Sequence, residues 1–410
     1  MNPSRVALSR LARAIFVAAA CSGVAAQGLP SAPIDLSTDE IAAVVSHGPW
    51  PPPQARDPTN RASGDRQAIA LGERLFADAA LSGSGTLSCA SCHDPARGFT
   101  DGKPRARGAS TLDRNTQGLL DVSTWRWFGW DGGTDSLWAA TLRPLLSPSE
   151  MGSDPARIAG RLRGDPAAMQ LVARLFGPAA DDELVAVAAA KAIAAWLETL
   201  RSPRTAFDEF RDALARGDAA QAARYPAAAR RGLKIFIGSG NCRACHVGPS
   251  FSNGEFHDVG RPFVVAPGRV DPGRHAGIRR VRADPYNLLG PFNDERGAPP
   301  EQQRALQTRT VVLQHRNWGE WRTPTLRGLL ATAPYMHDGG LPTLHDVVRH
   351  YSQLDLDRLH ADGESLLRPL DLSPREIDDL VAFLETLSPA RPASRAPRGK
   401  MRLANEENAR

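Results

Sequence analysis

Four of the five cysteines of this 410-residue chain fall into two copies of one short motif. The copies are Cys89-Ala-Ser-Cys92-His93 and Cys242-Arg-Ala-Cys245-His246. Cys-x-x-Cys-His is the attachment signature of c-type haem, in which both thiols bond to the porphyrin and the histidine ligates the iron. A redox dithiol or half of a zinc site is the alternative, but neither requires a histidine directly after the second cysteine. The sequence therefore predicts two covalently bound haems.

The fifth cysteine, Cys21, lies in a segment that is typical of a secretory signal peptide. Three arginines precede an apolar run over residues 14–20, which is far shorter than the ~20 residues that span a bilayer, and small residues follow it. We expect cleavage after residue 26, which places the mature protein in the periplasm. Lipidation of Cys21, which would anchor the protein facing the periplasm, is the less favoured alternative.

The formal net charge of +5 does not indicate a nucleic-acid partner. The three arginines of the signal segment supply three of those charges, which leaves +2 on the mature chain. The propionate carboxylates of two haems outweigh this charge, and the common nucleic-acid-binding motifs are missing from the sequence. The most apolar helical stretch, residues 184–200, contains Lys191 and Glu198, so we expect no membrane span.

The surroundings of the two motifs repeat. Gly72-Glu-Arg-Leu-Phe76 precedes the first motif and Gly232-Leu-Lys-Ile-Phe236 precedes the second, and an aromatic residue with a turn follows each. A single repeat at this long spacing predicts two related domains, each enclosing one haem. The predicted parts are a signal peptide (1–26), an N-terminal extension (27–64), an N-terminal haem domain (65–215), a C-terminal haem domain (216–387) and a disordered tail (388–410).

Helical patterns dominate the chain, and strand patterns are scarce. Apolar side chains recur at helical spacing over residues 65–76, 155–176, 182–200 and 205–215. Ser373-Pro374-Arg375-Glu376 is a capping box, and Thr343 is a candidate cap for a further helix. We therefore predict an all-α fold, with two cytochrome c-like haem domains and long connecting loops. Residues 262–321 fit no such pattern, and we interpret them as an insertion that shapes a partner surface.

Several short runs occur in an order that resembles the bacterial di-haem cytochrome c peroxidase family, and in particular its MauG-like branch. The resemblance covers residues 68–387 and includes the two haem motifs. Its other landmarks are Arg114-Asn115-Thr116, Trp130-Asp131-Gly132, Glu150-Met151-Gly152, Thr323-Pro324-Thr325-Leu326-Arg327 and Ala333-Pro334-Tyr335-Met336-His337-Asp338-Gly339. The resemblance implies a periplasmic oxidoreductase that reduces H2O2 at the N-terminal haem with electrons relayed through the C-terminal haem.

The resemblance also implies an open face on the first haem. Many members of the family carry a second histidine at the position of Ala109, and this chain has no histidine between His93 and His246. We expect an iron held by His93 alone, which is ready for peroxide without reductive activation. Glu150 corresponds to the family's distal glutamate, which transfers protons during O–O cleavage. From composition alone, a glutamate before Met-Gly is more often a solvated loop residue.

The resemblance assigns two other pocket positions, at residues 140 and 144. Pro144 matches the family residue at its position, whereas Ala140 stands where the family has a glutamine. The alanine removes a polar group from the expected peroxide pocket. We therefore leave the positioning of peroxide open.

Electron transfer between the haems is assigned by the resemblance to Trp130, which matches the tryptophan between the two haems. A large core aromatic is the alternative for this residue. Tyr351 matches the sixth ligand of the second haem in the MauG-like branch, and anionic oxygen ligation favours the ferric and higher oxidation states. His350 is the alternative ligand, but it would face roughly 100° away around the helix.

A calcium ion between the domains is likewise implied by resemblance. The Asn115 side chain and the carbonyls of Thr332 and Pro334 occupy the family's ligand positions, with waters completing the shell. Oxygen ligands suit a hard cation, although three protein ligands are few for Ca2+. The sequence alone identifies Asn115 only as a turn residue.

Two outcomes of the reaction with H2O2 are open at this point. A peroxidase draws electrons from a small cytochrome c or a cupredoxin, whereas a MauG-like enzyme oxidises a residue of a partner protein through a pair of Fe(IV) haems. A non-catalytic di-haem electron carrier and a peroxide sensor are alternatives of another class. The resemblance also allows a homodimer.

Overall fold

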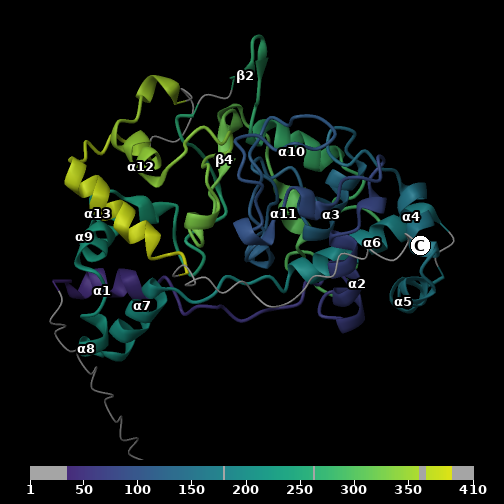
Figure 1. Ribbon diagram of the computed structural model, residues 1–410, viewed down its shortest axis with the longest axis horizontal. Helices are drawn as coiled ribbons and strands as arrows, with labels where there is room; N and C mark the ends of the chain where they lie inside the picture. The colour runs from purple at the N-terminus through teal and green to yellow at the C-terminus, as the bar shows by residue number, and fades with distance from the viewer. Residues whose placement is uncertain (1–34, 179–180, 262–263, 360–365, 390–410) are drawn as a thin grey trace, which may run out of the picture. The chain divides into compact units, whose positions relative to one another are not determined.

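Helices make up most of the regular structure of the computed structural model, which describes residues 35–178, 181–261, 264–359 and 366–389 (Figure 1). The α-helices of this part of the chain are α1 (Thr38–Val45), α2 (Arg66–Phe76), α3 (Leu137–Leu146), α4 (Pro155–Arg163), α5 (Pro166–Phe176), α6 (Asp182–Leu197), α7 (Ala206–Arg216), α8 (Ala219–Ala222), α9 (Ala227–Ile237), α10 (Arg274–Ala283), α11 (Ala305–Thr310), α12 (Leu344–Ser352) and α13 (Pro374–Glu385). The short 3-10 helices are η1 (Ala79–Leu81), η2 (Cys89–Ser91), η3 (Pro95–Arg97), η4 (Val122–Thr124), η5 (Cys242–Ala244), η6 (His315–Asn317), η7 (Leu329–Ala331) and η8 (Leu356–Arg358).

Four short strands form two small antiparallel sheets in the described part of the chain. Strand β1 (Phe256–Asp258) pairs with β4 (Glu320–Arg322), and β2 (Val264–Ala266) pairs with β3 (Arg269–Val270). The fold is therefore mostly helical rather than strictly all-α. Strands of two or three residues are too short to show the alternation from which a strand is predicted.

The predicted helices are present, with one interruption. Asp65 caps α2, Thr205 caps α7, and the capping boxes at Thr343 and Ser373 begin α12 and α13. The helix predicted over residues 155–176 is two helices, because Asp165 caps a new helix whose first residue is Pro166. A proline at that position cannot donate the backbone hydrogen bond that would continue α4.

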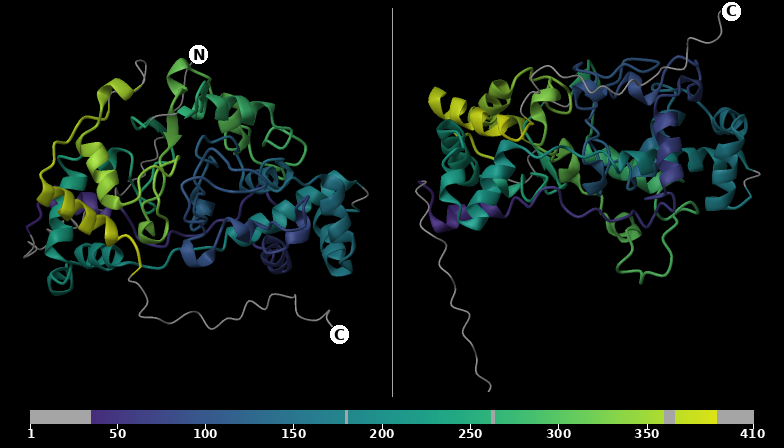
Figure 2. Two further views of the ribbon diagram at one scale, coloured as in Figure 1. Left: turned by 45° about the horizontal axis from the view of Figure 1, so that its top comes forward. Right: turned by 60° about the horizontal axis from the view of Figure 1, so that its bottom comes forward.

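The two repeats form equivalent helix crossings in two separate cores. Helix α2 packs against α6, and α9 packs against α13, which lie side by side in Figures 1 and 2. A Cβ on Gly72 would lie 2.0 Å from the carbonyl oxygen of Ala192, and a Cβ on Gly232 would lie 1.9 Å from that of Asp379. The two helices of each crossing can therefore approach this closely only because the residue at the contact is a glycine, which explains why both repeats begin with one.

Replacing Gly232 by alanine should destabilise the protein by about 3 kcal/mol or more. The added methyl group overlaps a backbone oxygen, so the whole helix must shift, and overpacking of this kind costs typically about 1–3 kcal/mol and occasionally more. Thermal denaturation monitored by circular dichroism measures the effect. Gly160→Ala is the matched control, because Gly160 lies in α4 with nothing within 4 Å of the added Cβ. Equal melting temperatures for the two variants would show that the contact between α9 and α13 does not require a glycine at position 232.

Segments outside the haem repeats also contribute to the two cores. Ile41 and Val44 of α1 belong to the core of α9 and α13, whereas Ala62 belongs to the core of α2 and α6. From the predicted insertion, Leu288 and Ala305 pack into that same N-terminal core. The insertion thus contributes to packing, while its role at a partner surface and the division into linear domains stay predictions.

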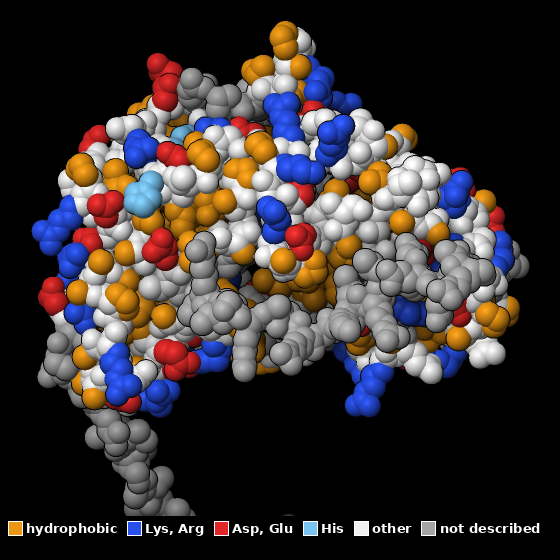
Figure 3. Space-filling view, viewed as in Figure 1, with side chains coloured by type: hydrophobic (Ala, Val, Ile, Leu, Met, Phe, Trp, Pro, Cys, Tyr) orange, Lys and Arg blue, Asp and Glu red, His pale blue; other side chains and the backbone are white. Residues whose placement is uncertain are grey.

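Several predictions concern residues that the structure does not describe. The signal peptide, Cys21 and nearly all of the predicted tail lie outside the described residues. No helix of the described part is long and apolar enough to cross a membrane. On the face shown in Figure 3, basic and acidic side chains lie interspersed over much of the surface.

Candidate functional site

In both haem-attachment motifs, the histidine ring is held by a hydrogen bond to a nearby backbone carbonyl. Each motif begins as a 3-10 turn, η2 or η5. Nδ1 of His93 donates to the carbonyl oxygen of Phe99, and Nδ1 of His246 donates to that of Phe251, each at 2.9 Å. A carbonyl can only accept, so Nδ1 carries the hydrogen and Nε2 of each ring keeps its lone pair for a metal.

The backbone around the two aromatic residues adopts an unusual conformation to make these contacts. Phe99 and Phe251 have φ angles of 61° and 51°, in the left-handed region that non-glycine residues rarely occupy. Burial lowers the pKa of His93, and it lowers the pKa of His246 to about 4. Both imidazoles are therefore neutral near pH 7, as metal ligation requires.

The first thiol of each motif has a raised pKa. Burial raises the pKa of the Cys89 and Cys242 thiols to about 12. Dithiols of the Cys-x-x-Cys redox type have depressed thiol pKa values, because only the thiolate is nucleophilic. The environment therefore favours the haem interpretation over the redox alternative for these motifs.

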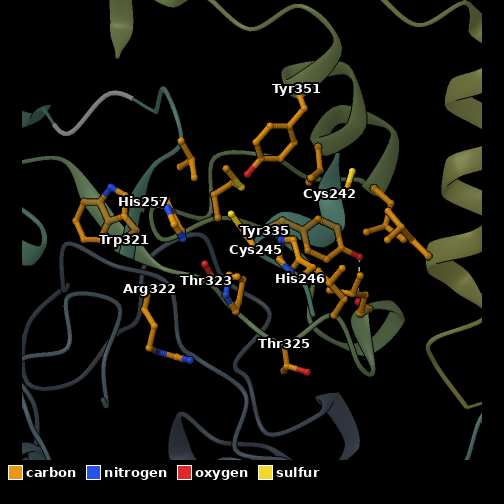
Figure 4. Close-up of a pocket in the computed structure, with 18 of the residues that line it drawn as sticks. Cys242, Cys245, His246, His257, Trp321, Arg322, Thr323, Thr325, Tyr335 and Tyr351 are labelled. Carbon is orange, nitrogen blue, oxygen red and sulfur yellow. Dashed lines mark hydrogen bonds between the residues drawn. The ribbon is translucent and has the colours of Figure 1, made fainter. Parts of the chain in front are cut away.

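A cavity of about 410 Å³ opens beside the second motif (Figure 4). Cys242, Cys245 and His246 line it, and Tyr351 projects its hydroxyl toward them from α12. Much of the remaining wall is apolar, and includes Phe236, Leu326, Leu344, Val348, Leu380 and Leu384. Two thiols, a neutral imidazole and an opposing phenol in an apolar cavity fit a covalently attached haem.

Tyr351 and His350 behave differently, although they are neighbours on α12. Tyr351 lines the cavity, whereas Nε2 of His350 is hydrogen-bonded to the carbonyl oxygen of Val259 at 2.8 Å. The His350 side chain is thus held outside the lining of the cavity. Burial raises the pKa of the Tyr351 phenol well above its usual value, so a phenolate there needs a cation beside it.

Trp130 and Asn115 also line this cavity. Nε1 of Trp130 donates to the carbonyl oxygen of Asn115 at 2.9 Å, and the Asn115 backbone N–H donates to the carbonyl of His337 at 2.8 Å. The predicted bridging tryptophan is thus tied to the loop that begins at Ala333. Trp130 is therefore positioned in the wall of the second-haem cavity, in a chain segment that belongs to the first half of the sequence.

The three predicted calcium ligands line this cavity together. Nδ2 of Asn115 donates to the Lys103 carbonyl at 2.8 Å, which leaves Oδ1 as the atom available to a cation. Thr332 and Pro334 lie in the same wall. The donor set is all oxygen and carries no charge, which fits a weakly held Ca2+ that takes its remaining ligands from water.

Near the first motif, Glu150 lies directly against Ala109. The backbone N–H of Ala109 donates to the Glu150 carbonyl at 2.8 Å, and a Cβ on Gly108 would lie 2.7 Å from the Glu150 Cα. The Glu150 carboxylate accepts a hydrogen bond from Arg143 at 3.0 Å. The field of Glu150 acts on both Cys92 and His93, so the carboxylate lies within electrostatic range of the first motif.

The two remaining pocket positions lie on α3, the helix that also carries Arg143. Ala140 and Pro144 are half-buried there. The carbonyl oxygen of Pro144 accepts from the backbone N–H of Met151 at 3.1 Å, which ties α3 to the loop of Glu150. The structure thus brings the Glu150 loop, α3 and the Ala109 loop together.

Sequence reasoning missed two buried residues in the wall of the second-haem cavity, Trp321 and Arg322. Trp321 stacks on the His337 ring at 3.7 Å between centroids, and its Nε1 is buried without a hydrogen-bond partner. Arg322 is 2% exposed, and its Nη2 is likewise buried without a partner. The one available signal was their position directly before the Thr323-Pro324 landmark. Buried donors without partners fit a cavity whose occupant supplies acceptors.

Two different segments of the chain match two known families. Residues 66–216 match the family described as di-haem cytochrome c peroxidase. Residues 320–354 match a family described as RoxA-like, cytochrome c-like. The second match contains the last two landmark runs, Thr323–Arg327 and Ala333–Gly339, and Tyr351.

Similar proteins cover nearly the whole chain. The methylamine utilization protein MauG of Methylorubrum extorquens is 32% identical over 381 residues, which is 92% of each chain. The cytochrome-c peroxidase IdrP2 of Pseudomonas sp. strain SCT is 31% identical, over 83% of this chain and 84% of the relative. A solved MauG-like protein associated with microbial copper homeostasis has a TM-score of 0.60 and 26% identity, covering 84% of this chain and 98% of that chain.

Proposed function

The chain belongs to the di-haem cytochrome c peroxidase family, and on this premise we propose that it reduces H2O2 at the His93 site with electrons that arrive through the His246 site. It is an oxidoreductase with two covalently attached c-type haems, one at each Cys-x-x-Cys-His motif. When bound, the first haem supplies the metal at which the O–O bond breaks, and the second stores and relays electrons. The remaining chemistry falls to the side chains.

Glu150 is the proposed proton carrier. The carboxylate would take a proton from one oxygen of H2O2 and return it to the other, which would leave as water. Two electrons and two protons in total reduce H2O2 to two waters. The hydrogen bond from Arg143 holds the carboxylate in one orientation. The observation that carries this proposal is the pairing of Ala109 with Glu150, because a methyl group stands there in place of a side chain that could ligate iron.

Trp130 is the proposed electron relay. It lines the cavity of the second motif, and its Nε1–H is fixed by the Asn115 carbonyl. A fixed indole keeps the same orientation through each turnover, so little reorganisation accompanies electron transfer. Neighbouring Asn115, with Thr332 and Pro334, is the proposed Ca2+ site that holds this junction together.

A MauG-like outcome is the second candidate, and Tyr351 favours it. Tyr351 lines the cavity opposite Cys245 and His246, while His350 is bonded to Val259. We propose Tyr351 as the sixth ligand of the second haem. An anionic oxygen ligand stabilises the oxidised metal, which suits storage of oxidising equivalents for a protein substrate. The MauG of Methylorubrum extorquens and the cytochrome-c peroxidase IdrP2 of Pseudomonas sp. strain SCT are 32% and 31% identical to this chain, so sequence identity does not separate the two outcomes.

The proposed partners follow from these two outcomes. A small cytochrome c or cupredoxin would donate electrons in the peroxidase, and a protein substrate would donate them in the MauG-like enzyme. We propose the periplasm as the compartment, on the basis of the segment formed by residues 1–26. The homodimer stays a prediction.

Stopped-flow mixing of the haem-loaded protein with H2O2 and a reduced c-type cytochrome tests the proposed function. We expect two cytochromes to be oxidised for each H2O2, without prior reduction of the enzyme. A spectral change that persists without any donor, and slow cytochrome oxidation, would favour the MauG-like outcome. No reaction with H2O2 would exclude both enzymes and favour the electron carrier.

Trp130→Phe separates the relay from the reaction with peroxide in this assay. We expect slower cytochrome oxidation with an unchanged first reaction with H2O2, because the two steps use different residues. Trp318→Phe is the matched control, since Trp318 lies outside the cavity lining and packs at a tilt against His275, with 4.8 Å between the ring centroids. If both variants turned over at the wild-type rate, Trp130 would be a packing residue.

A further inference from the structure

Arg322 is a buried cation that has no anionic partner among the described residues. It is 2% exposed and lines the cavity of the second motif. Nε donates weakly to the Gly129 carbonyl at 3.4 Å, and the guanidinium lies over the Trp125 ring at 3.8 Å. Nη2 is buried and makes no hydrogen bond. Burial lowers the pKa of Arg322 to about 9, with no carboxylate acting against this shift.

Two other arginines of the described residues are buried, and each shows a different arrangement. Arg327 also lines the cavity, but it makes two hydrogen bonds of 2.8 and 3.0 Å to the carboxylate of Asp208. Arg274 is stacked between Trp127 and Phe256 and donates to the Gly132 carbonyl at 2.9 Å, but it does not line the cavity. Arg322 alone among these three faces the cavity without a carboxylate.

A buried charge is costly unless it is paired or hydrogen-bonded. The stack on Trp125 offsets part of this cost, but an aromatic face leaves the guanidinium N–H donors unused. A haem in this cavity brings carboxylates of its own, and a guanidinium binds a carboxylate through paired N–H donors. The missing partner of Arg322 is therefore chemically of the kind that the cofactor supplies.

We propose that Arg322 binds a propionate carboxylate of a haem and that this ion pair sets the reduction potential of that haem. The proposal rests on haem attachment at the two motifs and does not require peroxidase activity. Removing the cation would leave the propionate charge uncompensated, which favours the more positive ferric state. Arg322 is thus a positioning residue that would make its haem easier to reduce.

Spectroelectrochemical titration of the haem-loaded protein, without peroxide, tests the proposal. Arg322→Met should lower the midpoint potential of one haem by at least about 59 mV, which corresponds to a tenfold change in its one-electron reduction equilibrium constant. Arg322→Lys keeps the charge, so its haem reduction equilibrium constant should stay within threefold of the wild-type value. Arg274→Met is the matched control, because it removes an equally buried and stacked arginine outside the cavity, and it should shift neither haem.

The haems at Cys242 and Cys89 give separate signals, so the signal that shifts shows which haem supplies the propionate. A shift of either signal supports the ion pair. Equal potentials in Arg322→Met and Arg274→Met would overturn the proposal and leave Arg322 as a partner of Trp125 only. If Arg322→Met does not fold, resonance Raman spectra of the wild type and Arg322→Lys decide. A shifted propionate bending band in the lysine variant supports the pair, because lysine cannot reproduce the two-donor geometry, and identical bands refute it.

Discussion

Glu150→Gln should slow the reaction of the diferric protein with H2O2 by a factor of about 10² to 10⁴, the usual contribution of a general acid–base group. Glutamine has nearly the same volume, and its carbonyl oxygen can still accept the hydrogen bond from Arg143. The amide, however, cannot take a proton from one peroxide oxygen and return it to the other. The loss should therefore appear in the second-order rate constant measured by stopped-flow absorption.

Glu73→Gln is the matched control for this variant, because Glu73 is an exposed residue of α2. It should react at the wild-type rate. The absorption spectra of both haems should also be unchanged in Glu150→Gln, since Glu150 is not proposed as a ligand. A Glu150→Gln protein that reacts as fast as Glu73→Gln would remove Glu150 from the mechanism.

Tyr351 substitutions should alter one haem and leave the other untouched. Tyr351→Phe removes the proposed sixth ligand, so the absorption spectrum of the Cys242 haem should change while that of the Cys89 haem stays the same. Tyr351→Met should raise the midpoint potential of the Cys242 haem by a substantial part of the roughly 0.8 V that axial ligands span. A neutral thioether favours the ferrous state, whereas an anionic oxygen favours the ferric state.

His350→Gln is the control for the Tyr351 variants, and it also tests the alternative ligand. Its imidazole is bonded to the Val259 carbonyl, so its loss should leave both spectra unchanged. A spectral change in His350→Gln together with an unchanged Tyr351→Phe would reverse the ligand assignment. Electron paramagnetic resonance of the ferric protein provides the same comparison for the spin state.

Local signals in the sequence predicted much of the fold. The capping box at Ser373 and the candidate cap at Thr343 predicted where two helices begin, because a cap depends on residues within one turn. The break between α4 and α5 carried the same kind of signal in Asp165 and Pro166, but the continuous apolar spacing concealed it. Capping residues are thus sufficient to predict where these helices begin.

Long-range packing was not predictable from one sequence. Strand β1 pairs with β4 through three residues each, far apart in the chain, and neither strand is long enough to show a pattern. The burial of Arg322 depends on Trp125, which lies in another part of the sequence. Of the candidate site, the haem motifs were readable from spacing alone, whereas the placement of Trp130, Glu150 and Tyr351 depended on the resemblance to a family.

The helix crossings at Gly72 and Gly232 depend on different stretches of the chain. The N-terminal crossing needs α2 and α6, whereas the C-terminal crossing needs α13, which begins at Pro374. Leu380 and Leu384 of α13 also line the cavity beside Cys242 and Cys245. A chain cut before Pro374 would therefore keep both attachment motifs but lose part of the wall of the second cavity.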